Sequence, residues 1–498
     1  MSATKDKKVV INKRLKGLSR EALEKLTQTE LIDKVVQLEA YNFQLRNLLQ
    51  KKLSEHDKHD KEYSGLFGGE ADGKVSQVAK TSNKVQKIRM FDWSSAHKRH
   101  VLLKITYFGW DYQGFACQED SNDTIESNLF RALTRTCLIE SRATSNYHRC
   151  GRTDKEVSAF CQVISIDLRS KHPPESQLDP TSLSSEIDYC GLLNRVLPKN
   201  IQCVAWMPLR STVYNARFDC VSRSYRYYFP KGDLDIAAMR KACDLLVRHA
   251  DFRNFCKMDV HNGVTNYMRN LQSARVEACY ENHTNSGYDM YYLEIQANAF
   301  LWHQIRCIMA VLLLVGQKKE KPAVISDLLD VESNPCKPQY TPAIGLPLNL
   351  FRCDFRDHTT RSVNHSGSGD ANEEAMDTVA DESDDLNAPE HVERDLTAWI
   401  YNEENLQKLI ENTQCEWTQF SVKSTMIRNV LQQLESLFEE NFKPKEKVLA
   451  QVTLLQDSVN PRQYQPLLER KRCESLENRI EHFVKKQRLI VKNETETE

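Results

Sequence analysis

The chain has no excess of basic residues, no apolar run long enough to cross a membrane and no signal-type apolar segment near its start. Its 498 residues contain 68 Lys and Arg against 69 Asp and Glu, for a net charge of -1. This balance excludes a uniformly basic nucleic-acid binder, so any nucleic-acid surface must come from local segregation of charge. The longest apolar run, 308–316, is shorter than the ~20 residues of a spanning helix. We therefore expect a soluble intracellular protein in the cytoplasm, the nucleus or both.

The cysteines lack the spacing of a zinc module. There are 15 of them, an odd number, spread from Cys117 to Cys473, and no two are separated as C-x-x-C. This pattern argues against both a zinc module and a disulfide framework. The sequence therefore predicts reduced thiols and no metal site.

Changes in composition predict six segments of different physical character. In order they are a basic flexible arm (1–18), a coiled-coil helix (19–53), a polar linker (54–96), a catalytic-size core (97–357), an acidic disordered segment (358–395) and a helical basic extension (396–498). The core alternates strand-like and helix-like patterns, which is typical of an α/β or α+β unit, and carries a surface insertion at 170–188. The acidic segment offsets basic surface elsewhere, so the near-zero net charge conceals local segregation.

The predicted helix at 19–53 carries a heptad seam. Its a and d positions are Leu31, Val35, Leu38, Asn42, Leu45 and Leu49. Two interpretations fit this seam. The helix pairs with a second copy, with Asn42 setting the register, or it packs on the core of its own chain.

The stretch "CGRTDKEVSAFCQVISIDL" at 150–168 places a carboxylate directly before a strand-like run. An aspartate at such a position is usually a local acceptor for backbone N–H groups in a turn. Arg152, two residues before Asp154, is a cation close in sequence that would hold the carboxylate ionised and oriented. Asp154 is therefore either a turn residue or a catalytic carboxylate.

Two further segments carry charge beside aromatic or apolar residues. In "RSYRYYF", strand alternation places Arg223, Tyr225, Tyr227 and Phe229 on one face. Rings and cations together suit RNA, although an aromatic core face with a basic solvent face fits equally well.

The second of these segments is "IQANAFLWHQIRCIMAVLLLVG", in which a strand runs into a helix. Arg306 falls off its apolar stripe near the helix start, where a cation is unfavourable without an anion. Arg306 is therefore a candidate ion-pair partner for a catalytic carboxylate, whereas a lone His303 is more often structural.

Six segments in this order resemble the TruA family of tRNA pseudouridine synthases. They are "YFGWDYQGF" (107–115), "CGRTDKEVSAFCQVISIDL" (150–168), "NARF" with "SRSYRYYF" (215–229), "DFRNFCK" (251–257), "ANAFLWHQIR" (297–306) and "GLPLNL" (345–350). The wording is most similar to the eukaryotic branch that modifies uridines 38 and 39 of the anticodon stem-loop. The resemblance covers about residues 97–357.

The resemblance implies a role for each matching residue. Asp154 would be the essential carboxylate and Arg306 its ion-pair partner, while Arg152 would hold the flipped-out nucleotide. Tyr225 would stack on the target base, and the remaining candidates for RNA contacts are Arg217 and Arg223. The family fold is a core of two similar halves around a basic cleft, and its members form homodimers. Isomerisation of uridine is redox-neutral and needs no cofactor, but it needs a base out of its stack and one carboxylate as nucleophile or general base.

Two positions depart from the family pattern, which has glycine where this chain has Glu156 and usually where it has Cys161. A glycine after a catalytic turn often supplies a positive φ, so Glu156 would be strained by about 1–3 kcal/mol there. Its charge would also repel the Asp154 carboxylate and raise the pKa of one of the two. Three interpretations follow: an enzyme that directs Glu156 to solvent, a slowed or specialised enzyme, or a tRNA-binding or folding factor without catalysis.

Overall fold

The computed structural model describes most of the chain outside the N-terminal and acidic segments. The described residues are 8–11, 91–118, 123–177, 179–209, 212–280, 286–356, 399–442, 448, 450–456, 463–486 and 489–492. The chain divides into two compact units, Met1–Ile11 with Phe91–Glu498, and Asn12–Met90. The predicted coiled-coil helix at 19–53 and the acidic segment at 358–395 lie outside the described residues.

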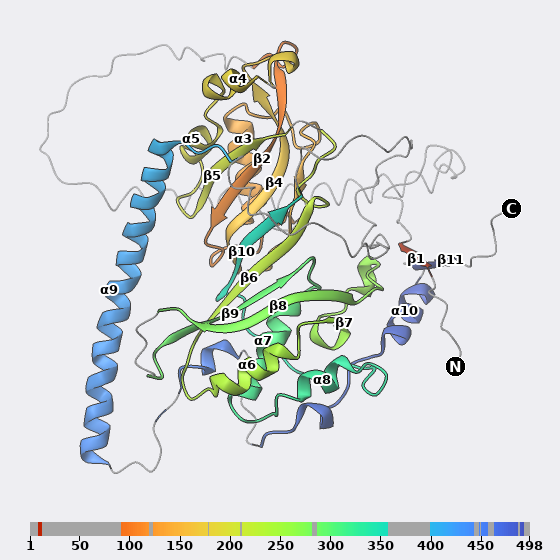
Figure 1. Cartoon of the computed structure of the whole chain (residues 1–498), viewed down its shortest axis with the longest axis vertical. Helices are drawn as coiled ribbons and strands as arrows, with labels where there is room; N and C mark the ends of the chain where they lie inside the picture. The colour runs from red at the N-terminus through yellow and green to blue at the C-terminus, as the bar shows by residue number, and fades with distance from the viewer. Residues whose placement is uncertain are drawn as a thin grey trace, which may run out of the picture. The chain divides into compact units, whose positions relative to one another are not determined.

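A nine-stranded sheet forms the centre of the larger unit (Figure 1). Its strands are β2 (His97–Tyr107), β3 (His148–Arg149), β4 (Ser158–Ser170), β5 (Ile201–Pro208), β6 (Cys220–Pro230), β7 (His249–Asp251), β8 (Met268–Ala278), β9 (Met290–Ala297) and β10 (Leu348–Phe355). They follow the spatial order β5-β2-β4-β10-β6-β9-β8-β7, and β3 pairs with β4 beside this path.

The sheet contains one parallel pair, β4 with β10, in which Ser158 lies opposite Asn349. The other pairs are antiparallel. Parallel neighbours begin at the same edge of a sheet. The loop before β4, which contains Asp154, is therefore brought beside the loop before β10.

Strand β6 shows how the sequence pattern produces the sheet. Tyr225, Tyr227 and Phe229 are buried, whereas Arg226 and Tyr228 are half-buried. Side chains alternate between the two faces of a strand, so one face joins the core and the other carries polar groups. The observed burial agrees with the predicted alternation from Tyr225 to Phe229, but not at Ser224, which is buried, or at Arg223, which is half-buried.

Helices cover the sheet along its length (Figure 1). They are α3 (Ile125–Arg135), α4 (Pro180–Ser185), α5 (Tyr189–Asn194), α6 (Ile236–Asp244), α7 (Gln304–Gly316) and α8 (Val324–Leu329). Helix α5 packs on β5, and α6 packs on α7 and β8. The sequence predicted a single apolar stripe on α7, but the helix is buried on all sides except at Arg306. A cation is thus retained in an otherwise buried helix.

The predicted insertion at 170–188 carries the short elements η1 (Pro174–Ser176) and α4. Within it, the buried Glu186 carboxylate lies 3.2 Å from the buried Arg99 guanidinium on β2. A buried ion pair of this kind fixes the position of the segment, because either charge without the other would be costly to bury.

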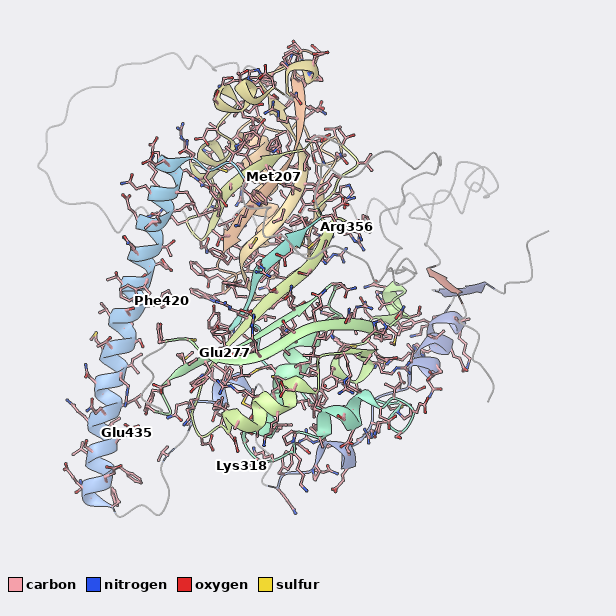
Figure 2. The ribbon with its side chains drawn as sticks, in the orientation of Figure 1. Met207, Glu277, Lys318, Arg356, Phe420 and Glu435 are labelled. Carbon is pink, nitrogen blue, oxygen red and sulfur yellow. The ribbon has the colours of Figure 1, made fainter. Side chains whose placement is uncertain are left out.

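The C-terminal region contains the 39-residue helix α9 (Glu403–Asn441) and the shorter α10 (Leu476–Lys485). Phe420 and Glu435 mark two levels along α9 in Figure 2. Two short strands, β1 (Lys8–Ile11) and β11 (Leu489–Lys492), pair antiparallel. None of the helices in the described ranges combines the length and apolarity needed to span a bilayer.

Candidate active site

The loop between β3 and β4 holds Asp154 in a fixed backbone conformation. The N–H of Phe115 donates to the carbonyl of Thr153 at 3.1 Å, and the N–H of Val157 donates to the carbonyl of Asp154 at 3.2 Å. The buried Tyr107 hydroxyl lies 2.8 Å from the Thr153 hydroxyl. Neighbouring segments therefore satisfy the backbone groups of the loop, which orients the carboxylate before any substrate arrives.

Two glycines allow other segments to press against this loop. A Cβ atom at Gly109 would lie 2.0 Å from the carbonyl oxygen of Val157, and one at Gly345 would lie 2.6 Å from that of Lys155. Only glycine permits such close backbone approach. The "YFGWDYQGF" and "GLPLNL" segments thus act on the site by shaping the Asp154 loop.

Two cationic or titratable groups face the Asp154 carboxylate. Its Oδ2 atom lies 3.8 Å from Nη1 of Arg306 and 3.5 Å from Nε2 of His303, and 27% of the side chain is exposed. Burial raises the pKa of Asp154, while Arg306, a hydrogen bond from Trp302 and the Lys257 ammonium lower it, leaving a net rise. The carboxylate therefore depends on the nearby cations for its ionisation.

Arg306 is held in place by its own contacts. Its Nε donates to the carbonyl of Ala343 at 2.7 Å, and Nη1 lies 3.3 Å from Nε2 of His303. Arg306 occupies the first turn of α7, where the Asp154 carboxylate supplies the anion that a cation at this helix end requires. The structure thus brings Asp154 and Arg306 together, as their predicted ion pair requires.

His303 is closer to Asp154 than the sequence indicated. It caps α7 in the left-handed conformation, with φ 60°. Burial and the Arg306 and Lys257 cations lower the pKa of His303 to about 4, so the ring is neutral near pH 7. Its Nδ1 atom is buried without a hydrogen-bond partner among the described residues. A neutral ring can donate from Nε2 to Asp154 or accept there from Arg306, but not both.

Aromatic side chains lie on β6 and on the segment before α7. Tyr225 is buried, and its ring meets Phe300 edge to face at 5.3 Å between centroids. Trp302 is 41% exposed, with the Lys257 ammonium 4.1 Å from its ring centroid. Phe300, Trp302 and Lys257 also line a cavity of about 130 Å³. Sequence reasoning did not single out Trp302 or Lys257, although Lys257 ends the segment 251–257 and Trp302 lies in the segment 297–306.

The three other predicted arginines lie in different environments. Arg152 is exposed on the Asp154 loop. The Arg217 guanidinium lies 5.2 Å from the ring of the exposed Phe218. Arg223 donates to the carbonyls of Cys150 at 2.8 Å, of Arg217 at 3.2 Å and of Asn298. Arg223 therefore ties the start of the Asp154 loop to the segment before α7, and its guanidinium is largely used inside the fold.

Glu156 has the left-handed backbone conformation expected at this position, with φ 67°. Its Oε1 lies 3.7 Å from Nζ of Lys155, and 37% of its side chain is exposed. The rise in the pKa of Asp154 comes from burial, so the predicted repulsion by Glu156 is not its cause. The interpretation in which Glu156 turns toward solvent fits this geometry.

Replacing Glu156 by Gly is expected to stabilise the protein. A left-handed conformation costs a non-glycine residue roughly 1–2 kcal/mol, and the extra unfolded-state entropy of Gly offsets part of the gain, so about 0.5–1 kcal/mol remains. Glu156→Ala is the matched control, because it removes the carboxylate but retains the Cβ atom. Urea denaturation measures both variants. A Gly variant no more stable than the Ala variant would show that the relieved strain does not exceed the entropy cost of Gly.

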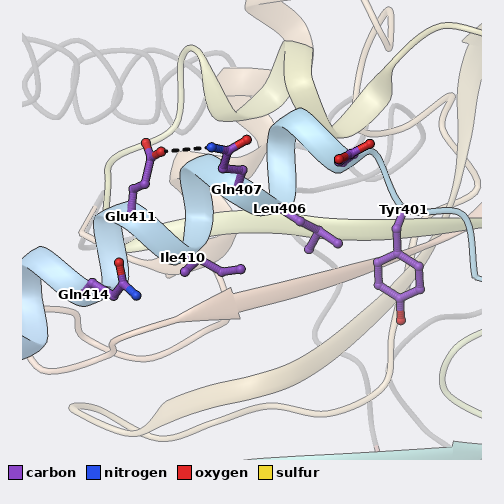
Figure 3. A pocket seen from close by; sticks show the side chains of 7 residues that line it. Tyr401, Leu406, Gln407, Ile410, Glu411 and Gln414 are labelled. Atoms are coloured by element: carbon purple, nitrogen blue, oxygen red, sulfur yellow. Dashed lines mark hydrogen bonds between the residues drawn. The ribbon is translucent and has the colours of Figure 1, made fainter.

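A larger hollow, of about 700 Å³, lies along the first turns of α9 (Figure 3). Its lining residues are Tyr401, Glu403, Leu406, Gln407, Ile410, Glu411 and Gln414. None of the predicted site residues lines it. The candidate active site is therefore the space around Asp154, Arg306 and the aromatic residues of β6 and the segment before α7.

The chain is similar in sequence to known proteins from several organisms. A profile described as tRNA pseudouridine synthase matches residues 242–356. The chain is 39% identical over 475 residues to the human tRNA pseudouridine(38/39) synthase, covering 90% of each chain. It is 38% identical over 315 residues to the Saccharomyces cerevisiae protein of that name, covering 62% of this chain and 70% of the yeast protein. It is 31% identical over 253 residues to tRNA pseudouridine synthase A of Methanosarcina mazei, covering 50% and 82%.

Proposed function

The chain belongs to the TruA-type family of tRNA pseudouridine synthases, and from this premise we propose that it isomerises uridine to pseudouridine at positions 38 and 39 of the tRNA anticodon stem-loop. The observation that carries the proposal is the half-buried Asp154 carboxylate, which faces Arg306 at 3.8 Å and accepts a hydrogen bond from Trp302. The relatives that share most of the chain carry this activity in their names. The alternative of a binding factor without catalysis draws no support from Glu156, which pairs with Lys155.

Asp154 is the residue assigned to the chemistry. The reaction breaks the N1–C1′ bond, turns the base and forms a C5–C1′ bond. C5 loses a proton and N1 gains one, so the reaction needs neither oxidant nor reductant. An ionised carboxylate serves either as the nucleophile at the sugar or base or as the general base. Arg306 supports both roles, because its cation favours the ionised form of a carboxyl whose pKa burial has raised.

The groups around Asp154 are assigned to holding the flipped nucleotide. Tyr225 presents a largely buried ring, so it is assigned as the wall against which the base stacks, together with Phe300. Arg152 and Arg217 are assigned to the phosphate backbone, since Arg pairs with phosphate through a planar fork. Arg223 is assigned mainly to positioning, because its guanidinium already serves backbone carbonyls.

Pseudouridine mapping tests this function directly. Purified protein is incubated with an unmodified tRNA that carries uridine at positions 38 and 39 and with a matched tRNA that carries cytidine there. Pseudouridine is expected at those two positions of the first tRNA and nowhere in the second. No product in the first tRNA, or product at other positions only, would reject the assignment.

The family core of two similar halves is part of the same proposal. The single parallel pair β4–β10 supports it, because antiparallel strands continue on both sides of this junction. Asp154 and Arg306 then come from opposite sides of the junction, as a central cleft requires. We place this activity in the cytoplasm, the nucleus or both.

Homodimerisation is also proposed, with α9 as its contact surface. Apolar side chains recur along α9 at heptad spacing and are 36–67% exposed: Ile410, Trp417, Phe420, Ile427, Leu431, Leu434 and Phe438. Heptad seams of this kind are buried by pairing helices, and a second copy supplies an identical seam.

Charges placed in the α9 seam are expected to convert the dimer to a monomer. The test variant is Ile427→Asp with Leu434→Asp, because a carboxylate in a dry helix seam is costly to desolvate. Thr425→Asp with Gln432→Asp adds the same two charges on another face of α9 and is the matched control. Sedimentation equilibrium measures the mass of each variant. A monomeric wild type, or a dimer that survives the seam substitutions, would contradict this contact surface.

A further inference from the structure

Three buried thiols from distant parts of the chain meet behind the Asp154 loop. Cys150 follows β3, Cys220 begins β6 and Cys353 lies in β10. The Sγ atom of Cys150 lies 3.3 Å from that of Cys220 and 3.4 Å from that of Cys353. All three sulfur atoms lie within 4.8 Å of one another.

These thiols are packed among apolar side chains and face the cation of Arg223. Leu102, Val163 and Met207 belong to the same small core cluster. The Arg223 guanidinium donates to the carbonyl of Cys150 and interacts electrostatically with all three thiols. A positive charge in an apolar pocket favours negatively charged neighbours. Deprotonated thiols would supply that negative charge.

We propose that Cys150, Cys220 and Cys353 form a thiolate site for a thiophilic metal ion, with Zn²⁺ as the ion that fits best. Thiolates are the ligands that Zn²⁺ prefers in structural sites. On binding, three thiols lose their protons to solvent, and Zn²⁺ with three thiolates carries one negative charge. The single positive charge of Arg223 then neutralises the site.

Metal binding requires only a small increase in the distances between the three sulfur atoms. At a Zn–S distance of about 2.3 Å, tetrahedral ligands place their sulfur atoms ~3.8 Å apart. The present separations of 3.3 and 3.4 Å thus open by a few tenths of an ångström. The Cys161 thiol, which interacts with that of Cys353, is the nearest candidate for the fourth ligand. Its thiolate would add a second negative charge, which the nearby Lys104 ammonium offsets.

Spacing in the sequence could not reveal this site. Cys150 and Cys220 are 70 residues apart, and Cys150 and Cys353 are 203 apart. Cys150 also lies four residues before Asp154, and Arg223 binds its carbonyl. An ion held here stiffens the base of the Asp154 loop and takes no part in the isomerisation. This inference does not depend on the proposed function.

Reduced thiols without metal are the competing state. In that state the Cys220 thiol donates to the carbonyl of Ser222 at 3.3 Å and the Cys353 thiol donates to the carbonyl of Cys161 at 3.2 Å. Each thiol then acts as a small buried apolar group. The two states differ in metal content, in proton release and in near-ultraviolet absorption after cobalt substitution.

Metal analysis of untagged full-length protein, reconstituted with Zn²⁺ under reducing conditions and then dialysed, separates the two states. We expect about one zinc per chain in the wild type and loss of most of it in Cys220→Ser and in Cys353→Ser. The control is Cys190→Ser, because Cys190 is also buried and lies 3.2 Å from Cys203, but in a cluster of two thiols. The control is expected to retain its zinc.

Cobalt substitution needs only the wild-type protein, so misfolding of a variant cannot affect the result. Co²⁺ alone is added to the metal-free protein, and bound thiolates produce charge-transfer absorption in the near ultraviolet. We expect saturation at about one Co²⁺ per chain, reversed by Zn²⁺. A wild type that holds no zinc and shows no such absorption would overturn the proposal, as would equal zinc loss in Cys190→Ser.

Discussion

Replacing Asp154 by Asn is expected to abolish pseudouridine formation, while the affinity for tRNA changes little. Asn keeps the shape of the side chain but can act neither as nucleophile nor as general base. Loss of an essential catalytic group lowers the rate by about 10³-fold or more. Single-turnover assays with excess enzyme measure the rate, and fluorescence anisotropy with labelled tRNA measures the affinity. Activity within about tenfold of wild type would remove Asp154 from the chemistry.

Stability as a function of pH shows whether the Asn variant is intact. Burial raises the pKa of Asp154 in the folded protein above its ordinary value of 3.8. A carboxyl with a raised folded pKa favours folding most when protonated, and this contribution is lost as pH rises through the folded pKa. The Asn variant should therefore be more stable than wild type at pH 7, with the difference shrinking as pH falls toward 3.8. A destabilised variant at pH 7 would point to structural damage.

Replacing Arg306 by Met has the second-largest expected effect. Arg306 lowers the pKa of the Asp154 carboxyl, so its removal raises that pKa further. The acid limb of the pH–rate profile should move to higher pH. The rate at pH 7 should fall by about 10²-fold, since both ionisation and orientation of the carboxylate suffer. Single-turnover rates measured between pH 5 and pH 9 test both expectations.

The matched control for Arg306→Met is Arg306→Lys. Lys keeps the positive charge but cannot reproduce the bond from Nε to the Ala343 carbonyl together with a contact to Asp154. The Lys variant should therefore keep the acid limb near its wild-type pH while losing part of the rate. A Met variant with an unshifted acid limb would show that Arg306 does not set the ionisation of Asp154. Equal rates for the Met and Lys variants would show that the positive charge at this position does not contribute to the rate.

Local patterns predicted the elements of the site well. Period-two alternation assigned the buried rings of β6, and Arg306 stood out because a cation at a helix start needs an anion. The positive φ at Glu156 followed from the family resemblance, because the family pattern has glycine at this position. The first two features depend on neighbours within a few residues, so the sequence alone is sufficient to predict them.

Other features of the site depend on contacts between distant segments. His303 was treated as structural, because nothing near it in sequence shows that its Nε2 lies 3.5 Å from Asp154. Arg223 was assigned to RNA, but its guanidinium reaches the Cys150 and Asn298 carbonyls across the sheet. The thiols of Cys150, Cys220 and Cys353 meet only because β3, β6 and β10 converge.

The sequence by itself determined the family and the strand and helix patterns of the core, and it predicted that Asp154 and Arg306 pair. It did so because motifs and periodicity are written in short stretches of chain. Tertiary structure alone decided which groups surround Asp154, why its pKa is raised and where buried thiols gather. The parallel pairing of β4 with β10 brings the loops before these strands to one edge of the sheet. Burial and electrostatic fields arise from that convergence, so no single segment of the sequence contains them.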